Sequence, residues 1–128
     1  MRIVARVRIW TLDEANAALP DVVETVARVG DLFATVRAGT ARTVGNGHRG
    51  NGEGSTAARQ DLQRLLASLE ADGIVVRDPD RGLIDFTAES PSGRRYWLCH
   101  LRGEAAIGWW HWPDDGFAGR QPVTALPD

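Results

Sequence analysis

The chain has 128 residues, a formal net charge of −2 and an ordinary share of charged residues. This length predicts one domain that buries most of its apolar surface without disulfides. The balanced charge gives no reason to expect attraction to nucleic acid or to a membrane surface. All fifteen basic residues are arginine, which excludes Schiff-base chemistry on a lysine amine.

Cysteine usage and hydropathy indicate the cell compartment. Cys99 is the only cysteine, so no disulfide can form within the chain. Residues 1–14 interleave arginines with apolar residues, a pattern too polar for a signal peptide, and no apolar run is long enough to span a bilayer. We therefore expect a cytoplasmic protein with neither membrane nor nucleic-acid partners.

The clearest local signal near the N-terminus is a helix start. Residues 1–9 alternate weakly, which predicts a short strand or an unpaired arm. Thr11 and Glu14 have the spacing of a capping box, and Trp10 occupies the position of a hydrophobic staple. A helix is expected to follow directly.

The first predicted helix covers residues 12–38. Pro20 predicts a kink after Leu19 or a restart with proline in the first turn. Beyond it, apolar residues recur at steps of three and four and form one stripe: Val22, Val23, Val26, Val29, Phe33 and Val36.

Residues 39–55 are rich in glycine and predict a flexible loop. The spacing of its glycines is similar to a phosphate-binding loop, but no P-loop lysine and no preceding strand accompany it. Ser55 or Thr56 then caps a second helix at residues 56–72, with Gly73 as its stop. The two helices predict an antiparallel hairpin.

Beyond Gly73 the periodicity changes to that of strands. Four segments are bounded by turn residues: 74–76, 83–86, 96–102 and 107–112. They predict a four-stranded antiparallel meander over residues 74–112, and the tail at residues 113–128 is expected to wrap the sheet rather than extend it. The fold class is therefore α+β, a two-helix hairpin packed on the meander.

Aromatic residues are concentrated in the last two predicted strands. Four of the five tryptophans lie between residues 96 and 112. Strand alternation predicts that Trp97 and Trp109 share one face, while Trp110 and Trp112 share the other. Since one face packs on the helices, the other tryptophan pair is expected to be accessible and to mark a binding surface.

An ordered set of motifs carries a family resemblance. It comprises Trp10–Asn16 with Leu19-Pro20, then Gly82–Phe86, Leu98-Cys99, Gly103-Glu104, Trp110-His111 and Gly116–Pro122. With these motifs the chain resembles an uncharacterised bacterial and archaeal family, domain of unknown function 2203. The resemblance implies a helical hairpin with a sheet and no settled activity. A long glycine-rich loop, and His100 in place of an aromatic residue, depart from the commoner pattern.

Asp85 is an acid inside an apolar run. A buried carboxylate is costly unless it is paired, so Arg120 or a histidine is expected beside it. Its role is then either that of a metal ligand or general base, or that of a structural ion pair or turn cap.

Cys99 has two interpretations that depend on strand register. If Arg102 pairs with Ile107, Cys99 opposes Trp110, and a slip by one residue brings it opposite His111. In the second register His111 could activate Cys99 as a nucleophile; otherwise Cys99 is an inert core residue.

The leading hypothesis is a small binding domain whose pocket lies between the last strands and residues 116–122. Trp109 and Trp110 would form the walls, His111 and Asp85 the floor, and Arg120 would orient a small anionic ligand. A divalent metal ion is the alternative occupant, held by Asp85, Cys99 and His111 with Glu104 or Asp115, although the spacing matches no established zinc motif.

Two further classes remain open. The protein could be an enzyme with His111 as general base and Asp85 as its orienting partner, or with Cys99 as nucleophile. It could also be a homodimeric assembly module that pairs through the helical hairpin or an aromatic face of the sheet.

Overall fold

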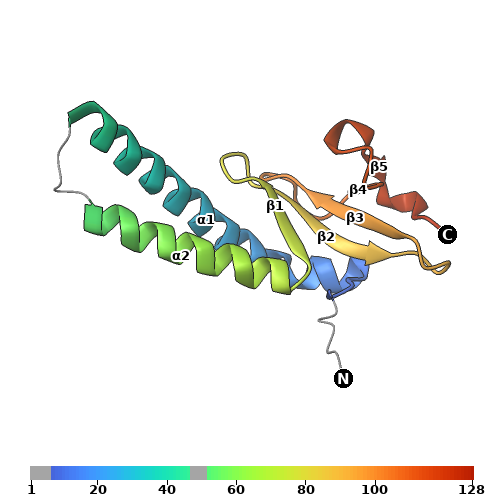
Figure 1. Ribbon diagram of the computed structural model, residues 1–128. Coiled ribbons are helices and arrows are strands. Elements are labelled where there is room, and N and C mark those ends of the chain that lie inside the picture. The colour runs from blue at the N-terminus through green and yellow to red at the C-terminus, as the bar shows by residue number, and fades with distance from the viewer. Residues whose placement is uncertain (1–6, 47–51) are drawn as a thin grey trace, which may run out of the picture.

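A computed structural model describes residues 7–46 and 52–128. Helices α1 (Leu12–Asn46) and α2 (Gly52–Ala71) form a hairpin, and a five-stranded antiparallel sheet follows them in the chain (Figure 1). The predicted α+β class is confirmed. Within the two described ranges no helix is both long and apolar enough to cross a membrane.

The start of α1 has the predicted cap. The Thr11 N–H donates to Glu14 Oε1 at 2.9 Å, and the Glu14 N–H donates to Thr11 Oγ1 at 3.1 Å. The buried Trp10 donates from Nε1 to the Asp72 carbonyl at 2.7 Å and packs edge-to-face on Phe86. One residue therefore joins the beginning of α1, the end of α2 and the sheet. The arm predicted at residues 1–9 lies mostly outside the described residues.

The first helix is longer than predicted. It continues through Pro20 as one helix, so the alternative of a restart at Pro20 is wrong, and it reaches Asn46 instead of ending near residue 38. A proline inside a helix costs about 3 kcal/mol, whereas each large apolar side chain buried on its stripe contributes about 1.5–3 kcal/mol. Since Leu19 and Val22 are both buried, packing on both sides of Pro20 maintains the helix.

Most of the segment predicted as a loop at residues 39–55 is helical. Helix α1 reaches Asn46, helix α2 begins at Gly52, before the expected cap at Ser55 or Thr56, and residues 47–51 of the segment lie outside the described ranges. A Cβ atom on Gly39 would approach Ser55 Oγ to 2.7 Å. At least one glycine that predicted a loop thus allows the two helices to approach closely.

The sheet consists of β1 (Ile74–Asp78), β2 (Leu83–Glu89), β3 (Arg95–His100), β4 (Trp109–His111) and β5 (Gln121–Pro122), in that spatial order. The four-stranded meander is confirmed, but the tail does extend it, because β5 pairs with β4. Short 3₁₀ turns at Phe117–Gly119 and Val123–Ala125 flank β5.

Alternation along the strands gives the sheet two distinct faces. We call inner the face that packs on α1; it carries Ile84, Phe86, Ala88, Tyr96, Leu98, His100 and Trp110. The outer face carries Asp85, Thr87, Trp97, Cys99, Trp109 and His111. The inner face forms the apolar core, with His100 as its polar member, and Asp85, Cys99 and His111 lie on the outer face.

Replacement of Phe86 by alanine tests the inner face. Phe86 is 0% exposed, so Phe86→Ala is expected to lower the free energy of unfolding by about 3–5 kcal/mol. The matched control is Phe117→Ala, whose ring is 45% exposed and whose loss should cost under about 1 kcal/mol. Urea unfolding measures both, and equal losses would contradict the assignment of the core.

Candidate functional site

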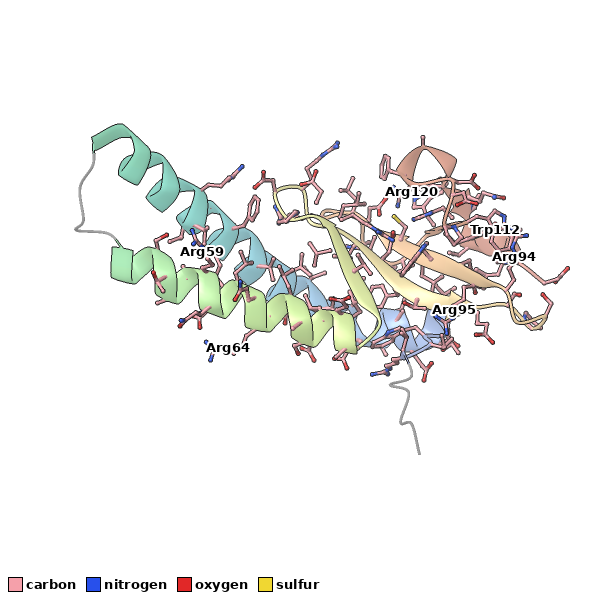
Figure 2. The ribbon with its side chains drawn as sticks, viewed as in Figure 1. Arg59, Arg64, Arg94, Arg95, Trp112 and Arg120 are labelled. Atoms are coloured by element: carbon pink, nitrogen blue, oxygen red, sulfur yellow. The ribbon has the colours of Figure 1, made fainter. Side chains whose placement is uncertain are left out.

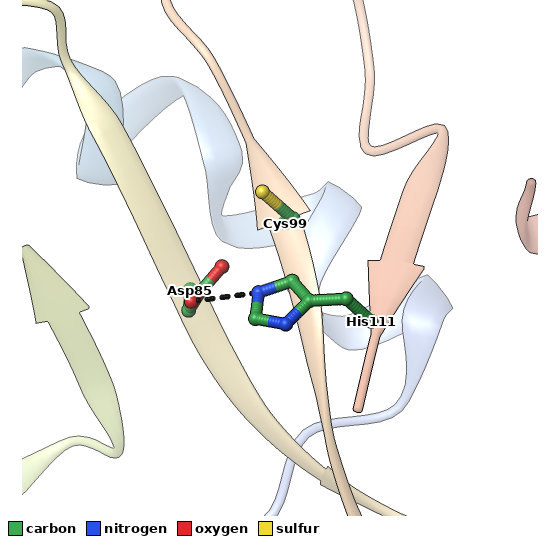
Figure 3. A group of neighbouring side chains, drawn as sticks. All are labelled: Asp85, Cys99 and His111. Carbon is green, nitrogen blue, oxygen red and sulfur yellow. Dashed lines mark hydrogen bonds and ion pairs between the residues drawn. The ribbon is translucent and has the colours of Figure 1, made fainter. Parts of the chain in front are cut away.

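Three residues with potential metal-ligating atoms meet on the outer face of the sheet. Asp85 on β2 lies directly opposite Cys99 on β3, and His111 on β4 lies opposite Trp97, two residues before Cys99. The side chains of Asp85, Cys99 and His111 converge in Figure 3, and all three residues are buried. One ligand atom from each lies within 4.8 Å of the others.

The register of β3 and β4 differs from both alternatives that the sequence left open. Cys99 pairs with Trp109, so it faces neither Trp110 nor His111 directly. Because His111 is two residues from Trp109, it shares the face of Cys99 and lies diagonal to it. This diagonal placement is close enough for a shared site.

His111 presents both ring nitrogens to acceptors. Nδ1 lies 2.8 Å from the Trp112 carbonyl oxygen, which only accepts hydrogen bonds, so Nδ1 carries the hydrogen. Nε2 lies 3.0 Å from Asp85 Oδ2. In neutral imidazole this leaves the Nε2 lone pair facing a carboxylate oxygen. The contact is favourable only with a proton or another cation between the two atoms.

The two carboxylate oxygens of Asp85 differ in their hydrogen-bond partners. Oδ2 accepts from Arg77 Nε at 2.9 Å in addition to its contact with His111. Oδ1 is buried and has no hydrogen-bond partner within the described part of the chain. A buried acceptor without a partner costs about 1–3 kcal/mol, so the carboxylate retains one unused ligand position.

Cys99 is held as a neutral thiol. The pKa of its thiol lies at about 12 instead of 9.0, mainly because of burial and also because the negative charge of Asp85 outweighs the positive charge of Arg120. His111 offers it no free nitrogen, because both are engaged. The arrangement therefore lacks the feature that activates a cysteine nucleophile.

The three residues border a cavity of about 240 Å³. Its lining is completed by Arg77, Leu83, Pro113, Gly116 and Phe117. Gly116 has a φ of 64°, which favours glycine, at the turn that leads into the Phe117–Gly119 helix. The C-terminal segment, residues 113–128, thus forms one wall of the cavity through Pro113, Gly116 and Phe117. Asp85, Cys99 and His111 form another wall.

Arg120 is engaged with Glu104. Its Nη2 donates to both carboxylate oxygens at 2.7 and 2.8 Å, and its guanidinium lies over the rings of Trp109 and Phe117. Burial acts to raise the pKa of Glu104, but hydrogen bonds from Arg120 and from the Leu101 N–H outweigh it, so that pKa lies below its usual value. Figure 2 shows Arg120 beside the C-terminal segment, away from the helical hairpin.

Two other candidates lie away from the cluster. Trp110 faces inward, donates from Nε1 to the Ala125 carbonyl at 2.9 Å and packs against Tyr96 and Trp112, so it shares no wall with Trp109. Asp115 is exposed and contributes no atom to the cluster of Asp85, Cys99 and His111.

One residue of the site, Arg77, is not predicted by the sequence patterns. It contacts Asp85, and its place directly after an apolar strand segment and eight residues before an acid is a signal that could have indicated a cross-strand pair. His100 points to the inner face, where its Nε2 lies 2.8 Å from the Glu104 carbonyl oxygen, so it does not reach the cluster.

Comparison with known proteins agrees with the resemblance that the motifs indicated. No curated protein and no solved structure matches the chain. Residues 8–123, most of the chain, match the family described as "Uncharacterized conserved protein (DUF2203)". The chain therefore belongs to the DUF2203 family.

Proposed function

We propose that this protein binds a divalent transition-metal ion, zinc by chemical preference, through Asp85, Cys99 and His111. These residues supply a carboxylate, a thiolate and an imidazole, the donor types of protein zinc sites. They stand on three consecutive strands of one sheet. Regular structure of this kind positions ligands more accurately than loops do.

The contacts of His111 carry the proposal. Metal-binding histidines commonly donate from their second ring nitrogen to a backbone carbonyl, as Nδ1 does here toward Trp112. A cation near Nε2 would satisfy that nitrogen together with the Asp85 carboxylate. Zinc–ligand bonds are about 2.0–2.3 Å long, so the three ligand atoms, which lie within 4.8 Å of one another, must shift slightly to bind an ion.

The surroundings favour Cys99 over the acidic alternatives as third ligand. Glu104 is held by Arg120, and Asp115 is exposed outside the cluster. Three protein ligands leave a tetrahedral ion one open position, as in zinc sites that bind water or substrate. Here that position would face the cavity.

Cobalt binding tests the ligand set. We expect Co²⁺ to bind with one-to-one stoichiometry and to produce the intense near-ultraviolet absorption of a thiolate–cobalt bond, which Zn²⁺ then abolishes by displacement. The variants Cys99→Ser, Asp85→Asn and His111→Gln should each weaken binding at least about tenfold.

Asp115→Asn is the matched control, because it makes the same change as Asp85→Asn at an exposed carboxylate and should leave binding unchanged. Circular dichroism establishes that each variant is folded. The thiolate–cobalt absorption of the unmodified protein is a measurement that needs no variant. If this absorption is absent, or if Co²⁺ still binds equally well to Asp85→Asn, the proposed ligand set is refuted.

Thiol reactivity separates the metal site from a nucleophilic cysteine. At pH 9 a thiol with a pKa of about 12 is roughly 0.1% ionised, against half for a thiol at 9.0. At pH 9, alkylation of Cys99 by iodoacetamide in the metal-free protein should therefore be about 500-fold slower than in the urea-unfolded chain, and its rate should rise with pH. Mass spectrometry follows the reaction, and rapid modification at pH 7 would favour the nucleophile hypothesis.

A further inference from the structure

We infer that the cavity beside Asp85, Cys99 and His111 binds a small organic monocarboxylate when the metal ion is present, with Arg77 as its second anchor. This inference rests on the proposed metal site and adds the class of ligand that takes its open position.

The size of the cavity limits the ligand. Its volume is about 240 Å³, below the range of about 300–1,000 Å³ typical of sites for drug-sized molecules. The cavity therefore suits a ligand smaller than a drug-sized molecule, such as a short-chain acid.

The charges around the cavity favour a monoanion. A divalent ion would be neutralised by the carboxylate of Asp85 and the thiolate of Cys99. Arg77 then leaves one uncompensated positive charge in the lining, because Arg120 is already paired with Glu104. A ligand with a single negative charge would compensate this remaining positive charge.

Arg77 is placed to hold a carboxylate. Its Nε donates to Asp85 Oδ2, and its guanidinium lies 4.8 Å from the centre of the Trp97 ring. Nη1 and Nη2 donate to no residue in the described ranges, and the side chain, which is 42% exposed, contributes to the cavity lining. The planar donors of arginine match the two oxygens of a carboxylate.

The remaining lining distinguishes an organic acid from an inorganic anion. Leu83, Pro113 and Phe117 supply the apolar part of the lining, beside the charged groups. Contact of these apolar side chains with a short hydrocarbon substituent contributes favourable binding free energy, because apolar surface is buried. Phosphate would place polar oxygens against the same side chains. The cavity therefore combines a site for a carboxylate with a site for a small apolar group.

The experiment uses the cobalt-loaded full chain and compares propionate, propionamide and inorganic phosphate. Propionate should change the visible d–d absorption of Co²⁺, because an oxygen enters its coordination shell, and should bind at least about tenfold tighter than either comparison ligand. Equal or tighter binding of propionamide or phosphate would overturn the inference. So would equally tight binding of propionate to the metal-free protein.

A variant tests the role of Arg77 separately. With cobalt held at saturation, Arg77→Gln should weaken propionate binding at least about tenfold, while Arg81→Gln, at an exposed arginine of the following turn, should not. Unchanged binding in Arg77→Gln would remove Arg77 as the anchor. If cobalt fails to bind the unmodified protein, the proposed metal site fails; if cobalt binds but propionate has no effect, only the present inference fails.

Discussion

The burial of the Asp85 carboxylate is the constraint on which the outer face depends. A charged group that is 1% exposed in the middle of a sheet costs several kcal/mol unless charged or polar partners compensate it. Arg77 on β1 and His111 on β4 supply those partners from strands on either side of β2 and β3. The pairing of this one carboxylate thus couples the positions of four strands.

The C-terminal segment completes the surroundings of that carboxylate. It leaves β4, turns at Gly116 and returns to pair as β5, so that Phe117 closes one side of the cavity. Arg120 anchors the return through Glu104 and through the rings of Trp109 and Phe117. The arginine that the sequence suggested as a ligand-recognising group thus supports a wall of the cavity, and Arg77 takes the position facing the cavity.

Local patterns were sufficient for much of the fold. The capping box at Thr11 and Glu14 depends on neighbours three residues apart, and the separation of Trp97 and Trp109 from Trp110 depends only on strand alternation. Helix length was harder to predict. Glycine and proline propensities suggested interruptions, but packing between α1 and α2 and burial on both sides of Pro20 outweighed them.

The sequence by itself therefore determined the class of fold, the two faces of each strand and the need of Asp85 for partners, because these follow from residue spacing and from the cost of burying charge. Only the tertiary structure decided that Asp85, Cys99 and His111 share one site. Their meeting depends on the register of β3 and β4, which the connection at residues 101–108 sets through contacts of Glu104 with Leu101 and His100. A shift of one residue would send His111 to the other face, and strand alternation alone carries no information on that shift.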